Sequence, residues 1–186
     1  MLVKNYIDEL FNILKNVEVT DHQDHALDRE DAVWHLTSVL KALKVTDNKL
    51  MFIGNGGSAA IASHMAVDYW KTTGIPALCF NEGAQLTCLG NDFGYQAVFE
   101  KPIEVFARPG DILIAISSSG KSPNIIRGVE AATRLRCRII TLSGFLPDNV
   151  LRSLGEYNFY CASTEYGFIE LTHQIILHML LDLMSK

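Results

Sequence analysis

The chain has 186 residues, of which 48% are hydrophobic and 20% charged, and its formal net charge is −5. This length suits one domain with a full hydrophobic core, and the composition is that of an ordinary globular protein, which excludes a disordered chain. The negative net charge offers no basic footprint for nucleic acid or anionic lipid, and no run of about 18 apolar residues is present to span a membrane.

The N-terminal segment predicts a helical arm. Residues 2–16 and 27–44 show the spacing of apolar residues that is typical of helices. The first of these segments is amphipathic and carries acidic residues, unlike a signal peptide with its apolar core. The polar connection between the two, "EVTDHQDHALDRED", contains His22 and His25. These histidines could bind a metal, but a solvated loop or a helix cap is the favoured interpretation.

From residue 49 onward, short apolar runs alternate with segments of helix length. This alternation, with continuously apolar strands, predicts a doubly wound parallel sheet with helices on both faces. The predicted strands are "KLMFIG" (49–54), "PALCF" (76–80), "DILIAIS" (111–117), "CRIITLS" (137–143) and "YNFYCA" (157–162). The predicted helices cover residues 57–72, 84–90, 101–107, 122–135 and 165–184.

The cysteines at positions 79, 88, 137 and 161 form no CxxC pair. Cys79, Cys88 and Cys137 lie in or beside apolar runs, so buried free thiols are favoured over disulfides or a metal cage. Free thiols favour the reducing cytoplasm as the location of the protein.

Two predicted strands end in loops that suit a phosphate, and ligands of doubly wound sheets bind beyond the carboxyl ends of the strands. In "GNGGSAA" (54–60), the glycines permit tight backbone turns and Ser58 begins a helix. In "ISSSGKSPN" (116–124), four serines surround Gly120 just before a helix that starts at Pro123. Hydroxyls and free backbone N–H groups at a helix start can surround a phosphate.

Helix capping is the alternative explanation for both loops, because Ser and Asn favour N-cap positions. Four serines in six positions, directly after an apolar strand, favour phosphate binding instead. Neither loop is a Walker motif or a GxGxxG fingerprint, so a small phosphorylated molecule is favoured over a nucleoside triphosphate or NAD.

Taken in order, "GNGGSAA", "GNDFGY" (90–95) and "ISSSGKSPNII" resemble a sugar isomerase (SIS) domain. With His64 and a histidine-bearing last helix, the chain is similar to the phosphoheptose isomerases over nearly its whole length. That family converts sedoheptulose 7-phosphate to D-glycero-D-manno-heptose 7-phosphate for bacterial lipopolysaccharide or capsule. The resemblance implies one SIS domain over 1–186 with a five-stranded, flavodoxin-like core over 47–186. It also implies that helices within 1–46 pack in a homotetramer with active sites between subunits.

The resemblance implies the residues that bind the sugar phosphate. Ser58, Ser117, Ser119 and Ser122 correspond to phosphate ligands, and Ser118 to a position that also contacts sugar. Asn55 and Asp92 match positions near the sugar hydroxyls, although a role in forming the turns remains the alternative for both. The full predicted substrate-binding set is Asn55, Gly56, Gly57, Ser58, Asp92, Ser117, Ser118, Ser119, Ser122 and Glu170.

Aldose–ketose isomerisation moves a proton between C1 and C2 through an enediol, which requires acid–base groups and stabilisation of an oxygen. At about 100° per residue, His64 and Asp68 share one helical face. The resemblance assigns Asp68 and His178 to the acid–base pair. It implies a Zn²⁺ site, found in some members, at His64, Asp68, Glu170 and His178, whose O and N donors suit that metal. An i, i+4 surface pair is the alternative for His64 and Asp68.

The chain departs from the family pattern at several positions. The usual glutamate base is Asp68, which is one methylene shorter, and the usual glutamine of the last helix is Glu170, whose charge favours a bound cation. An expected arginine is Thr72, next to Lys71, and an expected aspartate falls at Gly167. These differences bear on the exact sugar more than on the type of reaction.

Two other functions remain open at this point. A SIS adaptor that associates with a replication initiator, or a sugar-phosphate sensor, would bind without turnover. Neither needs His64, Asp68 and His178 together, so the isomerase is favoured. On the last helix, His173 and Gln174 are rivals of His178 for the position facing the sugar.

Overall fold

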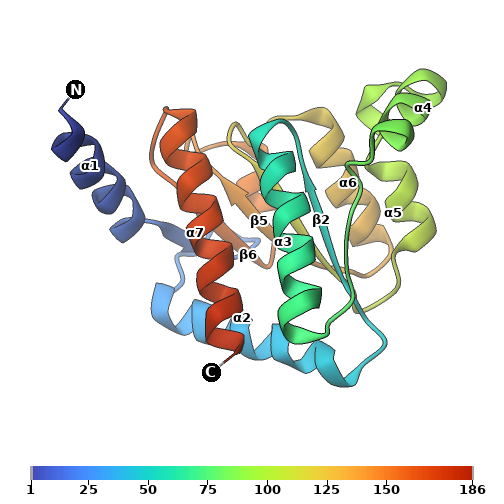
Figure 1. Cartoon of the computed structure of the whole chain (residues 1–186), viewed down its shortest axis with the longest axis horizontal. Coiled ribbons are helices and arrows are strands. Elements are labelled where there is room, and N and C mark those ends of the chain that lie inside the picture. Colours follow the sequence, from blue (N-terminus) through green and yellow to red (C-terminus); the bar gives the residue numbers. More distant parts are fainter. Residues whose placement is uncertain (1, 186) are drawn as a thin grey trace.

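The computed structural model describes residues 2–185 (Figure 1). The five strands expected from the apolar runs pair in parallel, and a sixth strand lies at one edge of the sheet. The strands are β1 (Glu18–Thr20), β2 (Leu50–Gly54), β3 (Ala77–Cys79), β4 (Ile112–Ser117), β5 (Arg138–Ser143) and β6 (Tyr157–Tyr160). Their order in the sheet is β1-β6-β5-β4-β2-β3. Without β1, this is the flavodoxin-like order 2-1-3-4-5, so the predicted fold class is confirmed.

Helices cover both faces of the sheet. The α-helices are α1 (Val3–Lys15), α2 (Arg29–Ala42), α3 (Gly57–Thr73), α4 (Gly83–Phe93), α5 (Glu100–Phe106), α6 (Pro123–Arg134) and α7 (Tyr166–Met184). Short 3-10 helices follow as η1 (Leu43–Val45), η2 (Tyr95–Ala97) and η3 (Val150–Ser153). Successive side chains of β2 point to opposite faces of the sheet and so show which helices cover each face. Phe52 packs with α2, α3 and α7, whereas Met51 and Ile53 pack with α5 and α6.

The topology places two loops next to each other. β2 and β4 are neighbours in the sheet, with Gly54 opposite Ile116 at their carboxyl ends. The chain leaves β2 toward α3 on one face and leaves β4 toward α6 on the other. Ligands of open α/β sheets bind at such a switch point. The two loops singled out in the sequence therefore meet at one crevice of the fold.

Part of a segment that was expected to be a connection forms a strand in the structure. Residues 18–20, taken from the sequence as part of a polar connection, form β1, which pairs antiparallel with β6. Val19 and Thr20 are buried there. The strand contains one large apolar residue, and tertiary pairing with β6 rather than local propensity determines its conformation.

The prediction of buried thiols needs a correction. All four cysteines are free, but Cys88 is exposed and Cys79 is half-buried, whereas Cys137 and Cys161 are buried. Cys88 lies on α4, and in the described structure no residue of α4 is buried. An apolar neighbourhood in the sequence therefore did not mean burial in this helix.

The N-terminal arm is open on one side. In Figure 1, α1 stands away from the sheet and approaches α7, and of its residues only Ile13 is buried. Exposed apolar side chains, among them Val3, Ile7 and Phe11, line the helix. Within residues 2–185, no helix combines the length and the apolar character needed to cross a membrane.

Candidate active site

A pocket of about 140 Å³ lies where the loops after β2 and β4 meet the first turn of α7. We call it the serine pocket. Its lining residues are Asn55, Ser58, Ser117, Ser118, Ser119, Ser122, Tyr166 and Glu170. The structure thus gathers the predicted phosphate-binding serines into one cavity.

Residues 117–122, which we call the serine loop, turn back at Gly120, whose φ of +61° is strained for other residues. The Gly120 N–H lies 3.2 Å from Ser117 Oγ, and Ser117 Oγ lies 3.4 Å from Ser122 Oγ. Pro123, which has no N–H, then starts α6, and the Ile125 N–H donates to the Ser122 carbonyl at 3.1 Å and to Asn124 Oδ1 at 3.0 Å. The backbone donor that remains in this first turn is the Asn124 N–H. This arrangement of hydroxyls at a helix N-terminus can hold an anion.

A second loop, which follows β5, supports the serine loop, because the Leu151 N–H donates to the Gly120 carbonyl at 3.0 Å and the Gly144 N–H to the Ser118 carbonyl at 2.9 Å. The buried Asn149 donates from Nδ2 to Ser143 Oγ at 3.2 Å and to the Leu146 carbonyl at 2.9 Å, and its Oδ1 accepts from Arg152 N at 3.1 Å. A Cβ on Gly120 would lie 1.9 Å from Asn149 Oδ1. Position 120 therefore has to be glycine for two reasons, its backbone conformation and this close approach.

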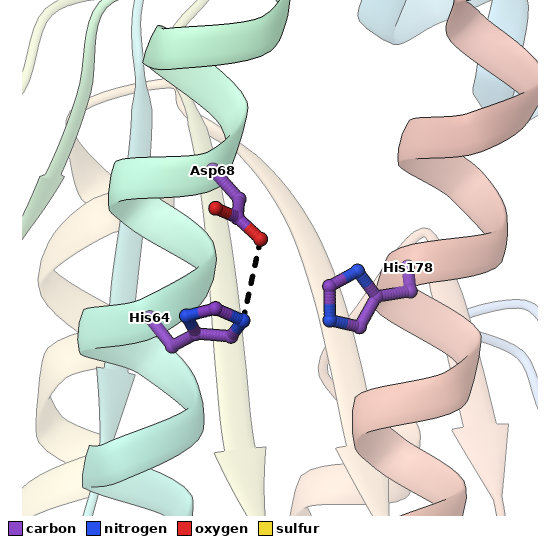
Figure 2. A group of neighbouring side chains, drawn as sticks. All are labelled: His64, Asp68 and His178. Atoms are coloured by element: carbon purple, nitrogen blue, oxygen red, sulfur yellow. Dashed lines mark ion pairs between the residues drawn. The ribbon is translucent and has the colours of Figure 1, made fainter.

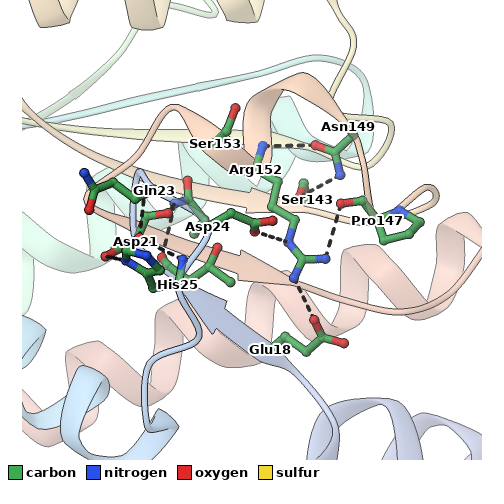
Figure 3. Close-up of polar contacts among 12 residues, drawn as sticks. Glu18, Asp21, Gln23, Asp24, His25, Ser143, Pro147, Asn149, Arg152 and Ser153 are labelled. Carbon is green, nitrogen blue, oxygen red and sulfur yellow. Dashed lines mark hydrogen bonds and ion pairs between the residues drawn. The ribbon is translucent and has the colours of Figure 1, made fainter.

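Arg152 connects this support to the edge of the sheet. Its Nη2 donates to Glu18 Oε2 at 2.7 Å (Figure 3). Its guanidinium also lies 4.3 Å from the centre of the Tyr160 ring. Glu18 belongs to β1, so the strand missed in the sequence helps to hold the serine loop. The sequence analysis also missed Asn149 and Arg152, and their role follows only from contacts between loops distant in sequence.

The carboxylate of Glu170, on α7, lies against the first turn of α3. Gly56 is the N-cap, with a φ of +55°. A Cβ on Gly57 would lie 2.4 Å from both carboxylate oxygens of Glu170. Glu170 therefore occupies the space that any other residue at position 57 would fill, where the helix dipole favours negative charge.

Farther along the same two helices, His64, Asp68 and His178 come together (Figure 2). Each offers one donor atom, and these atoms all lie within 4.8 Å of one another. His64 Nε2 is 3.2 Å from Asp68 Oδ2, and the rings of His64 and His178 have centres 5.4 Å apart. We call these residues the His–Asp cluster.

Buried contacts between α3 and α7 hold the cluster in place. The Tyr69 hydroxyl donates to the Leu177 carbonyl at 3.2 Å, and Gln174 Nε2 lies 2.9 Å from Met65 Sδ. Gln174 is thus engaged with α3. These contacts set the separation at which Asp68 and His178 face each other.

The charge state of Asp68 follows from its neighbours. Lys71 Nζ lies 3.0 Å from Asp68 Oδ1. This hydrogen bond lowers the pKa of the Asp68 carboxyl, and the nearby charges of His64, Lys71 and His178 act in the same direction. Asp68 is therefore a carboxylate at neutral pH, able to accept a proton or bind a cation.

The last helix divides its polar residues between two places. Glu170, predicted as a fourth metal ligand, lies in the serine pocket rather than with the cluster that the described residues form. Eight residues separate it from His178, about 12 Å along the helix axis. One carboxylate and two imidazoles suit Zn²⁺ and leave open coordination positions.

His173 points into the core instead. It is fully buried, its Nε2 lies 3.2 Å from the Ser143 carbonyl, and burial lowers its pKa to about 4. It is therefore an uncharged core residue that cannot face a ligand beside Asp68. Of the histidines on α7, His178 is the one in the cluster.

Asp92 lies apart from both sites. Its side chain is exposed on α4, where it contacts Cys88 Sγ at 3.6 Å and Asn91 Nδ2 at 2.8 Å. It does not line the serine pocket in this chain. Its assignment to the substrate remains a prediction.

Comparisons with known proteins identify the family of this chain. The family model for the SIS domain matches residues 5–144. A phosphoheptose isomerase of Pelobacter propionicus is 36% identical over 145 residues, which cover 75% of this chain and 76% of the relative. One of Enterobacter sp. is 29% identical over 193 aligned positions, covering 100% of this chain and 96% of the relative. The solved structure of the phosphoheptose isomerase from Neisseria gonorrhoeae has a TM-score of 0.83 at 24% identity, covering 98% of this chain and 96% of that one, and supports the fold.

Proposed function

We propose, from the membership of this chain in the phosphoheptose isomerase family of SIS domain proteins, that it converts sedoheptulose 7-phosphate to D-glycero-D-manno-heptose 7-phosphate. The reaction is an aldose–ketose isomerisation, and its product serves bacterial surface-polysaccharide synthesis in the cytoplasm. The observation that carries the proposal is that α3 and α7 bear two different sites at different positions along their length. A pocket of hydroxyls lies at one end, and an ionised carboxylate between two imidazoles lies about two turns away.

In the proposed complex, the serine pocket binds the phosphate. Ser58, Ser117, Ser119 and Ser122 donate hydroxyl hydrogens to its oxygens, and the Asn124 N–H at the start of α6 adds a backbone donor. Anchoring the phosphate there leaves the other end of the sugar free to extend along α3 and α7. The separation of about 9 Å from Ser58 to His64 along α3 suits a sugar of several carbons.

At the His–Asp cluster, Asp68 and His178 act as the acid–base pair. One of them removes a proton from C1 of the open-chain ketose while the carbonyl oxygen at C2 gains a proton, which gives the enediol. The hydroxyl at C1 then loses its proton and C2 gains one, which gives the aldose. The lowered pKa of Asp68 keeps it unprotonated and ready to accept.

The same cluster fits a metal ion. His64, Asp68 and His178 would hold Zn²⁺, with Glu170 as the predicted fourth ligand after a change of side-chain conformation. A bound cation would polarise the sugar oxygens and stabilise the negative charge that develops on them. His64 otherwise orients Asp68 through their 3.2 Å contact.

The active site is proposed to be completed by another subunit of a homotetramer. α3 and α7 expose apolar side chains that one chain leaves uncovered: Val67, Trp70, Leu171, Ile175 and Met179. α1 also exposes apolar residues that another subunit could cover. Helices within 1–46 therefore supply part of the proposed assembly surface.

Turnover by the purified protein, after metal analysis, tests the function. We expect sedoheptulose 7-phosphate to be converted to the aldoheptose 7-phosphate, followed by NMR, with added Zn²⁺ and with a chelator as parallel conditions. Binding without turnover under every condition would contradict the isomerase and support the adaptor or sensor alternatives. Arabinose 5-phosphate and fructose 6-phosphate serve as shorter comparison substrates.

A further inference from the structure

Asn55 stands between two cavities at the switch point of the sheet. It follows β2 and lines the serine pocket. It also lines a second pocket of about 260 Å³, together with Tyr95, Gln96, Ser122, Pro123 and Asn124. Its amide is therefore placed to contact a sugar, and the direction in which the amide points decides what it can bind.

The backbone fixes the orientation of the neighbouring Asn124. Its side chain is 3% exposed at the start of α6. Asn124 Oδ1 accepts from the Ile125 N–H at 3.0 Å. Only the amide oxygen can accept this bond, so a flipped Asn124 would place two donors against each other.

Asn124 in turn fixes Asn55. Asn55 Nδ2 donates to Asn124 Oδ1 at 2.9 Å, and Asn124 Nδ2 donates to Asn55 Oδ1 at 2.8 Å. The Tyr95 hydroxyl donates to the same Asn55 Oδ1 at 3.1 Å. Both lone pairs of Asn55 Oδ1 are therefore occupied, whereas one of the two Nδ2 hydrogens is free.

We propose that Asn124 and Tyr95 are positioning residues that lock Asn55 so that it offers the substrate one N–H donor and no acceptor. Asn55 then recognises an oxygen with a free lone pair, a hydroxyl or carbonyl oxygen of the phosphosugar. The inference rests on the proposed function, because it assigns the polarity of one contact within that site. A donor of this kind holds more tightly as negative charge develops on the oxygen during enolisation.

Tyr95→Phe tests the lock with the loss of one hydroxyl. Tyr95 is 59% exposed and its hydroxyl contacts Asn55, so we expect an unchanged melting temperature and unchanged affinity for inorganic phosphate. The kcat/KM for sedoheptulose 7-phosphate falls about 3- to 10-fold, the size of one lost hydrogen bond. Tyr157→Phe at the start of β6, where the ring lies beside His35, is the matched control and leaves kcat/KM unchanged.

A double-mutant cycle separates positioning through Asn55 from a general structural effect. If Tyr95 acts through Asn55, Tyr95→Phe costs nothing further in an Asn55→Ala background. An equal cost in both backgrounds, or a parallel loss of phosphate affinity, overturns the inference. If the wild type shows no turnover, the proposed function fails instead. The same cycle is then measured on the dissociation constant of sedoheptulose 7-phosphate, with the same criteria.

Discussion

The serine pocket and the His–Asp cluster are built in different ways on the same pair of helices. The loop that forms the pocket is buried and supported by a second loop, with Ser117 and Ser118 at 5% exposure and Asn149 at 3%. In the cluster, by contrast, the His64 side chain is 54% exposed and projects from an open helix face. One chain thus completes the proposed anion site, whereas the cluster is less enclosed, because His64 is exposed and Asp68 and His178 are half-buried. Changes in the two regions should therefore have separable effects.

The largest expected effect concerns the cluster. Asp68→Asn and His178→Gln remove the proposed acid–base groups, so kcat should fall by about 10² to 10⁴. Affinity for inorganic phosphate should stay at the wild-type value, because the serine loop does not depend on these side chains. Steady-state kinetics and calorimetric titration measure the two quantities. Loss of phosphate binding in either variant would show that the two regions are not separable.

The next effect concerns the supported loop. Gly120→Ala places a Cβ against Asn149 and forces a left-handed backbone on alanine, so the free energy of unfolding should fall by about 2 to 4 kcal/mol. Phosphate affinity should fall with it. Gly74→Ala is the matched control, because Gly74 has a φ of +77° with nothing within 4 Å of its would-be Cβ. Urea unfolding of both variants gives the comparison, and equal losses would contradict the role assigned to Asn149.

A smaller effect is expected at the residue between the two regions. Glu170→Gln removes a negative charge from the lining of the serine pocket. Affinity for inorganic phosphate should rise about 3- to 10-fold at low salt and less at high salt. Calorimetric titration at two salt concentrations measures this. An unchanged affinity would mean that the carboxylate does not act on the bound anion.

The smallest effect concerns the acid stability of the cluster. Because the pKa of Asp68 is lowered on folding, its contribution to stability is present above its unfolded pKa and is lost as pH falls through the lowered value. Lys71→Ala removes the largest cause of this shift, so the pKa of Asp68 should rise toward its ordinary value. The contribution to stability should then be smaller and should be fully lost at a higher pH. NMR titration of the carboxyl carbon checks this. Lys101→Ala, which breaks another i, i+3 ion pair with Glu104, should leave Asp68 unchanged.

The comparison also explains what the sequence could predict of the fold. Continuous apolar runs marked all five parallel strands. β2 and β4 are buried on both faces, which leaves a strong local signal, whereas the edge strand β3 is only partly buried. β1 left no such signal, since its three residues depend on pairing with β6. Cys88 was wrongly expected to be buried, because α4 buries none of its residues in the described chain.

The site shows the same limits. Glycine and serine spacing indicated the anion pocket, and helical spacing placed His64 beside Asp68. The supporting contacts of Asn149 and Arg152 could not be predicted from the sequence, because they join segments that are far apart in it. The position of Glu170 depends on its side-chain conformation rather than its spacing, and its predicted place in the metal site remains to be tested.

Isomerisation in D₂O tests the central claim most directly. The wild-type protein is incubated with sedoheptulose 7-phosphate in D₂O, and the product is followed by NMR. The account predicts aldoheptose 7-phosphate that carries solvent deuterium at C2, because a proton on Asp68 or His178 exchanges before it returns to carbon. Failure to form the aldose, with the ketose recovered unlabelled while it still binds to the serine pocket, would contradict enediol chemistry at this site.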